Sequence, residues 1–272
     1  MEIPDDILKI LQNSSIRANC IVMPSEPART IILIGRTRTG KSTIAAVLKN
    51  SIYAPHHLNI YCGTEEPFVE KVGGLTIIDM PGFFNQNHIG SRVNLDNEVI
   101  NQMLNKKIRT VNESQTLYAF VFNVANGINT EDISTMLLVK RKYPHISKRL
   151  MLVLTHCEEI NAHERTQLID NFFNEESVKR NRLRELFEYG VLYMGCIRPE
   201  SIEQHNVSAI LREYANVVNM RKEFIQRIYS VTNHAASVEN SGCCRSLFIS
   251  CCVCVGLIFL LCQKIITYRK QT

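Results

Sequence analysis

The sequence predicts an α/β fold in which a doubly wound, mainly parallel sheet carries helices on both faces. Short apolar runs with strand composition alternate along the chain with longer segments of helical pattern. The expected strands are residues 31–34, 75–79, 117–124, 150–154 and 191–194. Strands that are separated by helices pair in parallel, and such sheets bind ligands at the carboxyl ends of their strands.

The segments between and after these strands have the features of helices. Residues 42–48 follow the first strand and a glycine-containing loop. Thr130 is the expected N-cap of a helix through residue 139, with acidic residues in its first turn. Another helix is expected over 177–188, stopped by Gly190. Apolar residues at helical spacing over 202–229 predict a C-terminal helical region.

The loop between the first strand and the first helix carries the strongest motif. Residues 35–42 read GRTRTGKS and fill every fixed position of the phosphate-loop pattern G-x-x-x-x-G-K-[ST]. Its backbone amides and the helix N-terminus favour phosphate at this point. Lys41 would contact the β- and γ-phosphates, and the Ser42 hydroxyl would bind Mg²⁺. The expected phosphate-binding residues are Gly35, Arg36, Thr37, Arg38, Thr39, Gly40, Lys41, Ser42 and Thr43.

A second motif, Asp-Met-Pro-Gly, ends the strand at 75–79. Asp79 is placed to bind Mg²⁺ through water, and the Gly82 amide to contact the γ-phosphate. Thr64 is the only threonine between the first helix and this strand, which makes it the only candidate for a further hydroxyl ligand to Mg²⁺. A surface threonine without a special role is the alternative interpretation of Thr64.

A third motif, Thr155-His156-Cys157-Glu158, follows the strand at 150–154. The Glu158 carboxylate could accept hydrogen bonds from guanine N1–H and the 2-amino group, while the His156 imidazole could stack on the base and Thr155 line the same loop. Solvated side chains on a surface loop are the alternative.

Charge argues against nucleic acid as a partner. The formal net charge is +5, but four of these charges come from the C-terminal stretch, which contains no Asp or Glu. The rest of the chain is nearly neutral, whereas a nucleic-acid-binding domain carries a basic excess. The ten cysteines show neither a disulfide framework nor zinc-type spacing, so we expect the nucleotide-binding part in the reducing cytosol.

The C-terminal stretch itself predicts a membrane anchor. Residues 246–262 carry no charge and would extend about 25 Å as a helix, near the lower limit for crossing a bilayer. Basic residues flank this run on both sides, and few residues follow it, as in tail-anchored proteins. A buried core helix is the alternative. Cys243 and Cys244 are possible sites of S-palmitoylation. The expected destination is an endomembrane or the mitochondrial outer membrane.

Taken together, these segments resemble the GTPases of the immunity-associated protein family (GIMAPs), which share a G domain with plant chloroplast import receptors. The resemblance runs from about residue 29 to about residue 200 and is carried by GRTRTGKST, DMPGFF, NVANGINTEDISTM, LTHCEEI and RLRELFEYG. It implies a Ras-like P-loop G domain with extra C-terminal helices, binding of GTP/GDP and Mg²⁺, and nucleotide-controlled dimers or oligomers at membranes.

The expected organisation follows from the resemblance and the tail. It comprises an N-terminal extension at 1–28, the G domain at 29–200, a helical extension at 201–231, a linker at 232–245, a single transmembrane helix at 246–266 and a short tail at 267–272.

The chain departs from the family pattern around the base and the reacting phosphate. Glu158 stands where the family has Asp, and because Glu is longer, pairing of both its carboxylate oxygens with guanine requires a retracted backbone or a different rotamer. Residues 195–197, directly after the last strand, contain no Asn to help hold the base. Phe83 and Phe84 follow Gly82, where some GTPases place a catalytic Gln. Arg36 and Arg38 are therefore the catalytic candidates, in cis or across a dimer, and solvent-facing arginines are the alternative.

These observations predict a membrane-anchored GTP-binding protein that acts as a nucleotide-switched scaffold with slow GTP hydrolysis. Its expected partners are a guanine nucleotide, the lipid bilayer and further copies of the same chain. Two alternatives stay open: a non-hydrolysing membrane interaction protein with a structural phosphate loop, and a P-loop ATPase or kinase.

Overall fold

A computed structural model describes residues 3–55, 64–84 and 96–230. The described residues up to Tyr229 belong to one compact unit. The expected linker, the transmembrane helix at 246–266, Cys243 and Cys244 lie outside the described residues. None of the helices within the described ranges is long and apolar enough to cross a membrane.

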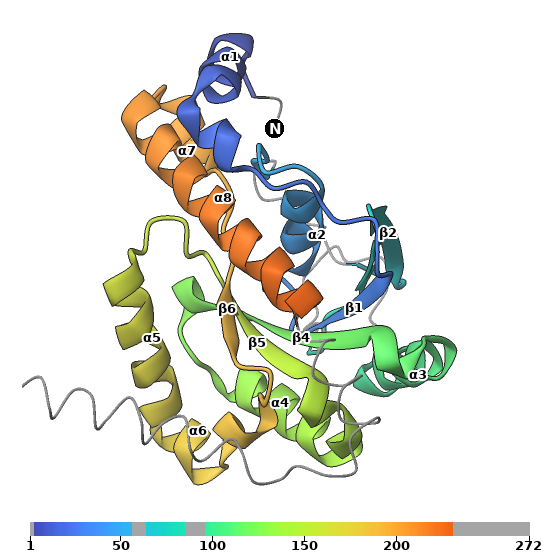
Figure 1. Ribbon diagram of the computed structural model, residues 1–272. Coiled ribbons are helices and arrows are strands. Elements are labelled where there is room, and N and C mark those ends of the chain that lie inside the picture. Colours follow the sequence, from blue (N-terminus) through green and yellow to red (C-terminus); the bar gives the residue numbers. More distant parts are fainter. Residues whose placement is uncertain (1–2, 56–63, 85–95, 231–272) are drawn as a thin grey trace, which may run out of the picture. The chain divides into compact units, whose positions relative to one another are not determined.

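Within the described residues, six strands form one sheet in the order β2-β3-β1-β4-β5-β6 (Figure 1). Strand β2 pairs antiparallel with β3, and every other neighbouring pair is parallel. The mainly parallel α/β sheet is therefore confirmed. The strand bounds are β1 Arg29–Ile34, β2 Phe68–Val72, β3 Leu75–Asp79, β4 Thr116–Asn123, β5 Leu150–Thr155 and β6 Val191–Tyr193.

Strand β2 is the one strand of this sheet that the sequence did not predict. It lies at the edge, and its first two residues, Phe68 and Val69, are both exposed. Because consecutive strand residues point to opposite faces, an edge strand that is open on both faces lacks the apolar alternation that identifies a half-buried strand.

The helices cover the sheet on both faces. Figure 1 shows α2 and α8 on one face and α3, α4 and α5 on the other. The helix bounds are α1 Asp5–Asn13, α2 Lys41–Lys49, α3 Asn97–Thr110, α4 Thr130–Lys142, α5 Ala162–Asn174, α6 Glu176–Arg180, α7 Pro199–Glu203 and α8 Val207–Ser230. Helices α2, α4 and the C-terminal helical region are confirmed, whereas α1, α3 and α5 were not predicted.

The N-cap of α4 is Asn129, so the expectation of Thr130 was wrong. The Asn129 side chain accepts a hydrogen bond from the Asp132 amide, and the Asp132 carboxylate accepts one from the Asn129 amide. This reciprocal capping box satisfies two amides that the helix itself leaves without partners. Because Asn129, the residue before Thr130, is also a good capping residue, it takes the N-cap position and Thr130 becomes the first residue of the helix.

The helix expected over residues 177–188 was also wrong. Helix α6 ends at Arg180, and a 3₁₀ turn over Leu183–Leu186 follows it. The Asn181 side-chain amide donates to the carbonyl oxygen of Ser177 at 2.7 Å, and Arg182 takes a left-handed backbone conformation with φ 51°. A non-glycine residue in this conformation ends a helix.

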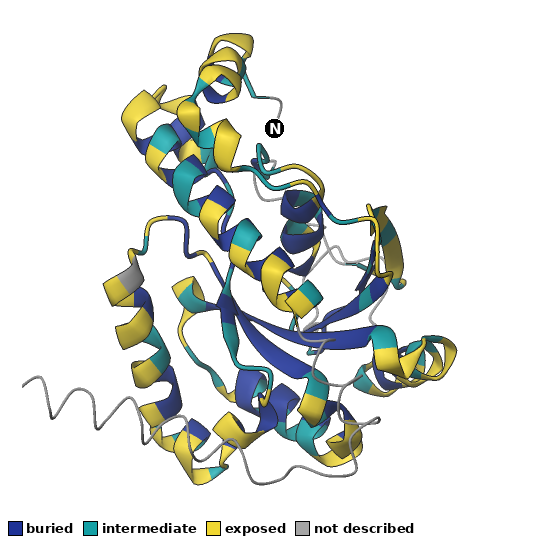
Figure 2. Cartoon of the chain, in the orientation of Figure 1, coloured by how far each residue is buried: buried dark blue, intermediate teal, exposed yellow. Residues whose placement is uncertain are grey.

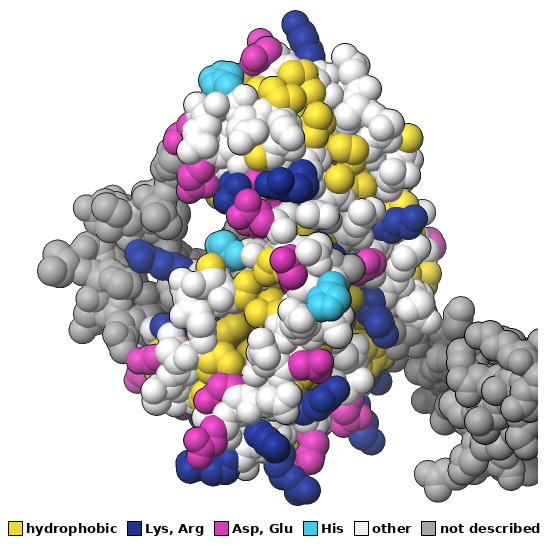
Figure 3. All heavy atoms as spheres, turned by 90° about the vertical axis from the view of Figure 1, so that its left-hand side faces the viewer, with side chains coloured by type: hydrophobic (Ala, Val, Ile, Leu, Met, Phe, Trp, Pro, Cys, Tyr) yellow, Lys and Arg dark blue, Asp and Glu magenta, His cyan; other side chains and the backbone are white. Residues whose placement is uncertain are grey.

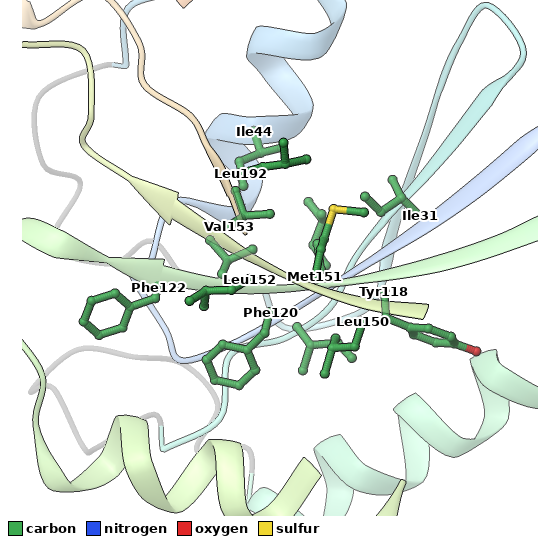
Figure 4. Packing of buried hydrophobic residues seen from close by; sticks show 14 of the residues in the cluster. Ile31, Ile44, Tyr118, Phe120, Phe122, Leu150, Met151, Leu152, Val153 and Leu192 are labelled. Atoms are coloured by element: carbon green, nitrogen blue, oxygen red, sulfur yellow. The ribbon is translucent and has the colours of Figure 1, made fainter. Parts of the chain in front are cut away.

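The core fills both sides of the sheet. Figure 2 shows the central strands buried along their length. In Figure 4, Phe120 and Phe122 of β4 point to one side, while Met151 and Val153 of β5 point to the other, toward Ile44 of α2. Strands that bury both faces read as continuous apolar runs, which is why the sequence identified them.

The C-terminal helical region contributes to this core and to a second apolar cluster. Val217, Phe224 and Ile228 of α8 pack into the main core. The second cluster combines α1, α7 and the first half of α8, with Ile7, Leu11, Ile202, Ile210, Tyr214 and Val218 among its members. Arg221 of α8 donates from Nε and Nη2 to the carbonyl oxygen of Leu48 near the end of α2, at 3.1 and 2.8 Å. Helix α8 is thus joined to the helix that follows the phosphate loop.

Candidate nucleotide-binding site

The phosphate loop connects β1 to α2 at the carboxyl end of the sheet. The Lys41 ammonium donates to the carbonyl oxygens of Gly35 at 3.3 Å and Arg36 at 2.6 Å, so it lies across the loop. Burial lowers the Lys41 pKa to about 8, and the nearby Asp79 carboxylate opposes this shift. A buried cation that donates to two carbonyl oxygens in this way is suited to an anionic ligand such as phosphate.

The three residues predicted to bind Mg²⁺ lie together. The Asp79 Oδ2 atom accepts from the Ser42 hydroxyl at 2.6 Å and from the Thr64 hydroxyl at 3.2 Å. The two hydroxyl oxygens are 3.5 Å apart. The other carboxylate atom, Asp79 Oδ1, is buried and has no hydrogen-bond partner among the described residues. Hard oxygen ligands with a spare buried carboxylate oxygen fit a Mg²⁺ ion.

The loop after β3 lies directly on the phosphate loop. The Thr37 hydroxyl donates to the carbonyl oxygen of Gly82 at 3.2 Å, and the Thr37 amide donates to the carbonyl oxygen of Phe83 at 3.3 Å. A Cβ atom at Gly82 would come within 2.3 Å of the Thr37 nitrogen. Only glycine allows this approach, which keeps Gly82 next to the phosphate loop.

Arg36 forms an ion pair with Asp132 at the start of α4. The distance from Nη1 to Oδ1 is 3.3 Å, and Asp132 is buried. Burial raises the Asp132 pKa, and the Arg36 guanidinium opposes that rise. Sequence reasoning missed Asp132, although the acidic first turn of α4 was a usable signal. Arg38, the other catalytic candidate, is exposed at a left-handed position of the loop with φ 64°.

The remaining predicted residues of the loop stabilise its shape or begin the helix. The Thr39 hydroxyl donates to the carbonyl oxygen of Arg36 at 3.0 Å. Gly40 is the N-cap position of α2, and Thr43 lies in its first turn.

The loop that follows β5, residues 155–160, is attached to the phosphate loop by its first residue. The Thr155 hydroxyl donates to the carbonyl oxygen of Thr39 at 2.7 Å and lies 3.2 Å from the carbonyl oxygen of Phe122. His156 follows in a left-handed conformation and is exposed. We name residues 155–160 the base loop.

Glu158 is buried, so the expectation of a solvated side chain does not hold for it. Glu158 is 5% exposed, and burial raises the pKa of its carboxyl group to about 7. Its Oε2 atom has no hydrogen-bond partner among the described residues. A Cβ atom at Gly195 would lie 2.6 Å from Oε2 and 2.8 Å from the backbone nitrogen of Glu158, so a larger residue there would force this loop to move.

The structure thus brings together two groups of predicted residues. Lys41, Ser42, Thr64 and Asp79, which were expected at the phosphates and the metal ion, form one group, while Thr155, His156 and Glu158, which were expected at the base, form the other. Sequence reasoning did not find Asn216 of α8, whose side-chain amide donates to the carbonyl oxygen of Glu158 at 2.8 Å. No local motif marks Asn216, because it lies 58 residues away along the chain.

The chain is similar at low sequence identity to solved structures of another protein. The crystal structure of Toc33 from Arabidopsis thaliana in complex with GDP and Mg²⁺ is similar, with 13% identity and a TM-score of 0.44 over 84% of this chain and 92% of that chain. The complex of Toc33 with Mg²⁺ and GMPPNP gives 14% identity and a TM-score of 0.47 over the same shares. No significant match was found among curated protein sequences.

The model of the AIG1 family matches residues 29–241, from the first residue of β1 to beyond the end of α8. This range exceeds the 29–200 expected from motifs, because it includes the C-terminal helices. As the match covers most of the sequence, the chain belongs to the AIG1 family, and its resemblance to the GTPases of the immunity-associated protein family is confirmed.

Proposed function

We propose that this protein binds GTP and GDP together with Mg²⁺, and that the bound nucleotide controls its assembly into dimers or oligomers on a membrane. The observation that carries the proposal is the convergence of Ser42, Thr64 and Asp79 beside the buried Lys41. These residues come from α2, from the segment before β2 and from β3, and a single site for Mg²⁺ and phosphate explains why they meet.

Each residue has a distinct task in this proposal. Lys41 and the amides of the phosphate loop bind the β- and γ-phosphates, while Ser42, Thr64 and Asp79 hold the ion directly or through water. The ion would bridge phosphate oxygens and neutralise charge on them. Gly82 presents its amide to the terminal phosphate. Glu158 accepts from the base, and His156 stacks on it.

Hydrolysis is slow in this proposal. Arg36 pairs with Asp132, and aromatic residues follow Gly82 where some GTPases place a catalytic Gln, which supports slow turnover. Arg38, exposed in the phosphate loop, is the remaining candidate in cis or across a dimer. Faster turnover then depends on a second protomer. If the rate per protein molecule is the same at low and high protein concentration, assistance within a dimer is excluded.

The metal dependence of nucleotide binding tests the core of the proposal. The affinity of the full chain for a fluorescent GTP analogue should fall when Mg²⁺ is chelated. Ser42→Ala should abolish most of this difference, whereas the exposed Ser25→Ala, remote from the site, should preserve it. Binding that is equally tight with and without Mg²⁺ contradicts the proposal.

The preference for guanine or adenine nucleotides distinguishes this function from that of an ATPase or kinase. GDP and ADP are titrated against the same analogue. Guanine preference supports the assignment of Glu158, while equal competition by ADP favours the ATPase alternative. A phosphate loop that binds neither nucleotide supports the structural alternative.

Membrane attachment through residues 246–266 completes the proposal. The uncharged run with basic flanks supports it. This segment, fused to a fluorescent protein, should move to an endomembrane or to the mitochondrial outer membrane, and a diffuse cytosolic signal would argue against an anchor. The nucleotide-binding part then faces the cytosol.

A further inference from the structure

Helix α8, which lies outside the nucleotide-binding sheet, fixes the base loop directly. The Asn216 Nδ2 atom donates to the carbonyl oxygen of Glu158 at 2.8 Å. The same loop is held from two other sides. The Cys157 amide donates to the carbonyl oxygen of Met194 after β6, at 3.3 Å, and the Glu159 carboxylate pairs with Arg198 at 2.7 Å.

The residue that Asn216 holds carries an unused hydrogen-bond acceptor. Glu158 is about nineteen-twentieths buried, and its Oε2 atom has no partner among the described residues. Since a buried acceptor without a partner is costly, this oxygen indicates a ligand that brings an N–H donor. The backbone of Gly195 lies against the carboxylate, so the side chain has little room to reorient.

Asn216 is itself held by a rigid helix. One turn earlier, the fully buried Glu213 accepts from the Arg198 guanidinium at 2.8 Å and from the Ser201 hydroxyl at 2.6 Å. Five residues later, Arg221 donates to the carbonyl oxygen of Leu48. Figure 3 views the side of the molecule with α5 and α8, where basic and acidic side chains lie beside one another. The base loop is therefore positioned by a helix that cannot shift without breaking buried hydrogen bonds.

We propose that Asn216 is a positioning residue that sets base selectivity: by holding the Glu158 carbonyl, it directs the Glu158 carboxylate so that both oxygens accept from a purine with an N1–H and a 2-amino group. This inference rests on the nucleotide-binding function proposed above. The backbone carbonyl and the side chain of Glu158 branch from the same Cα atom, so a displacement of the backbone here also displaces the carboxylate.

A comparison of guanosine and inosine nucleotides isolates this effect. GDP and IDP differ only in the 2-amino group, so their affinity ratio measures the second hydrogen bond to the carboxylate. Hydrogen bonds to charged groups contribute about tenfold or more to such a ratio. The full chain in detergent solution is titrated with fluorescent GDP, and GDP and IDP compete for it.

Three variants make the test specific. Asn216→Asp has the same shape but replaces the donor by an acceptor, and Asn216→Gln keeps a donor on a longer side chain. Asn219→Ala, on the same helix and exposed, is the matched control. We expect the preference for GDP over IDP to fall about tenfold in Asn216→Asp, to be retained in larger part in Asn216→Gln, and to be unchanged in Asn219→Ala.

The outcomes separate this inference from the function on which it rests. The affinity ratio comes from one sample, so it does not depend on the fraction of folded protein. An unchanged ratio in Asn216→Asp, or an equal loss of affinity for both nucleotides, overturns the positioning role while leaving nucleotide binding intact. If the unmodified chain binds neither nucleotide, the proposed function itself fails.

Discussion

The hydroxyl of Thr155 donates to the carbonyl oxygen of Thr39 at 2.7 Å and so connects the base loop to the phosphate loop. Both residues are buried, and they lie 116 positions apart in the sequence. A nucleotide that bridges the two loops would therefore find their separation already fixed.

Thr155→Val should weaken both the fold and the site. Valine has nearly the same shape but leaves the carbonyl oxygen of Thr39 without this donor. We expect the free energy of unfolding to fall by about 1–2 kcal/mol, and GDP affinity to fall as well because the loops separate. Denaturant unfolding and GDP titration measure the two effects. Thr110→Val, at an exposed hydroxyl on α3, is the control and should change neither.

Lys41→Ala should remove most nucleotide affinity. The variant loses the charged group next to the phosphates, and we expect GDP and GTP to bind about a hundredfold more weakly or worse. Lys49→Ala removes an exposed lysine from the other end of the same helix and should leave binding unchanged. Unaltered GTP affinity in Lys41→Ala would falsify the assignment of the phosphate loop.

Arg36→Ala should act on stability more than on hydrolysis. It leaves the buried Asp132 without its cation, which should cost about 1–3 kcal/mol in the free energy of unfolding. Asp132→Asn keeps an acceptor for the α4 cap and removes the charge, so Arg36→Ala should cost less in its presence. A double-mutant cycle measures this coupling. A collapse of single-turnover GTP hydrolysis with unchanged stability would instead identify Arg36 as catalytic.

Guanine nucleotide affinity should rise between pH 6 and pH 8. Burial raises the Glu158 pKa to about 7, the neighbouring Glu213 carboxylate adds to the rise, and Arg198 opposes it. Only the ionised carboxylate accepts from both N1–H and the 2-amino group, so protonation below pH 7 weakens binding. We expect a change of about tenfold over this interval, measured by GDP titration at each pH.

Glu158→Gln is the control for this pH dependence. The amide cannot ionise, so its weaker binding should vary little with pH. In the protein without nucleotide, the effect of pH on folding stability is opposite to its effect on affinity. The folded state holds the Glu158 proton more tightly than the unfolded chain, so this residue lowers stability as pH rises from about 4.5 through 7. If GDP affinity in Glu158→Gln depends on pH as steeply as in the unmodified chain, another group is responsible for the titration.

Much of the fold could be predicted from the sequence because the patterns that identify its elements are local. Buried parallel strands are short apolar runs, and the phosphate loop is a contiguous pattern, so both were identified. Helix α5 was missed, although Asn161 and Glu164 form a capping box at its start. Strand β2 was missed because it is exposed on both faces.

The sequence by itself determined the α/β class and the phosphate-loop pattern and predicted that Ser42, Thr64 and Asp79 lie together, since each depends on neighbours in the chain or on the order of strands. Only the tertiary structure decided the environment of those residues. It buried Glu158, paired Arg36 with Asp132 and brought Asn216 of α8 to the base loop. Burial and long-range hydrogen bonds depend on which distant segments pack together, and no local pattern encodes that packing.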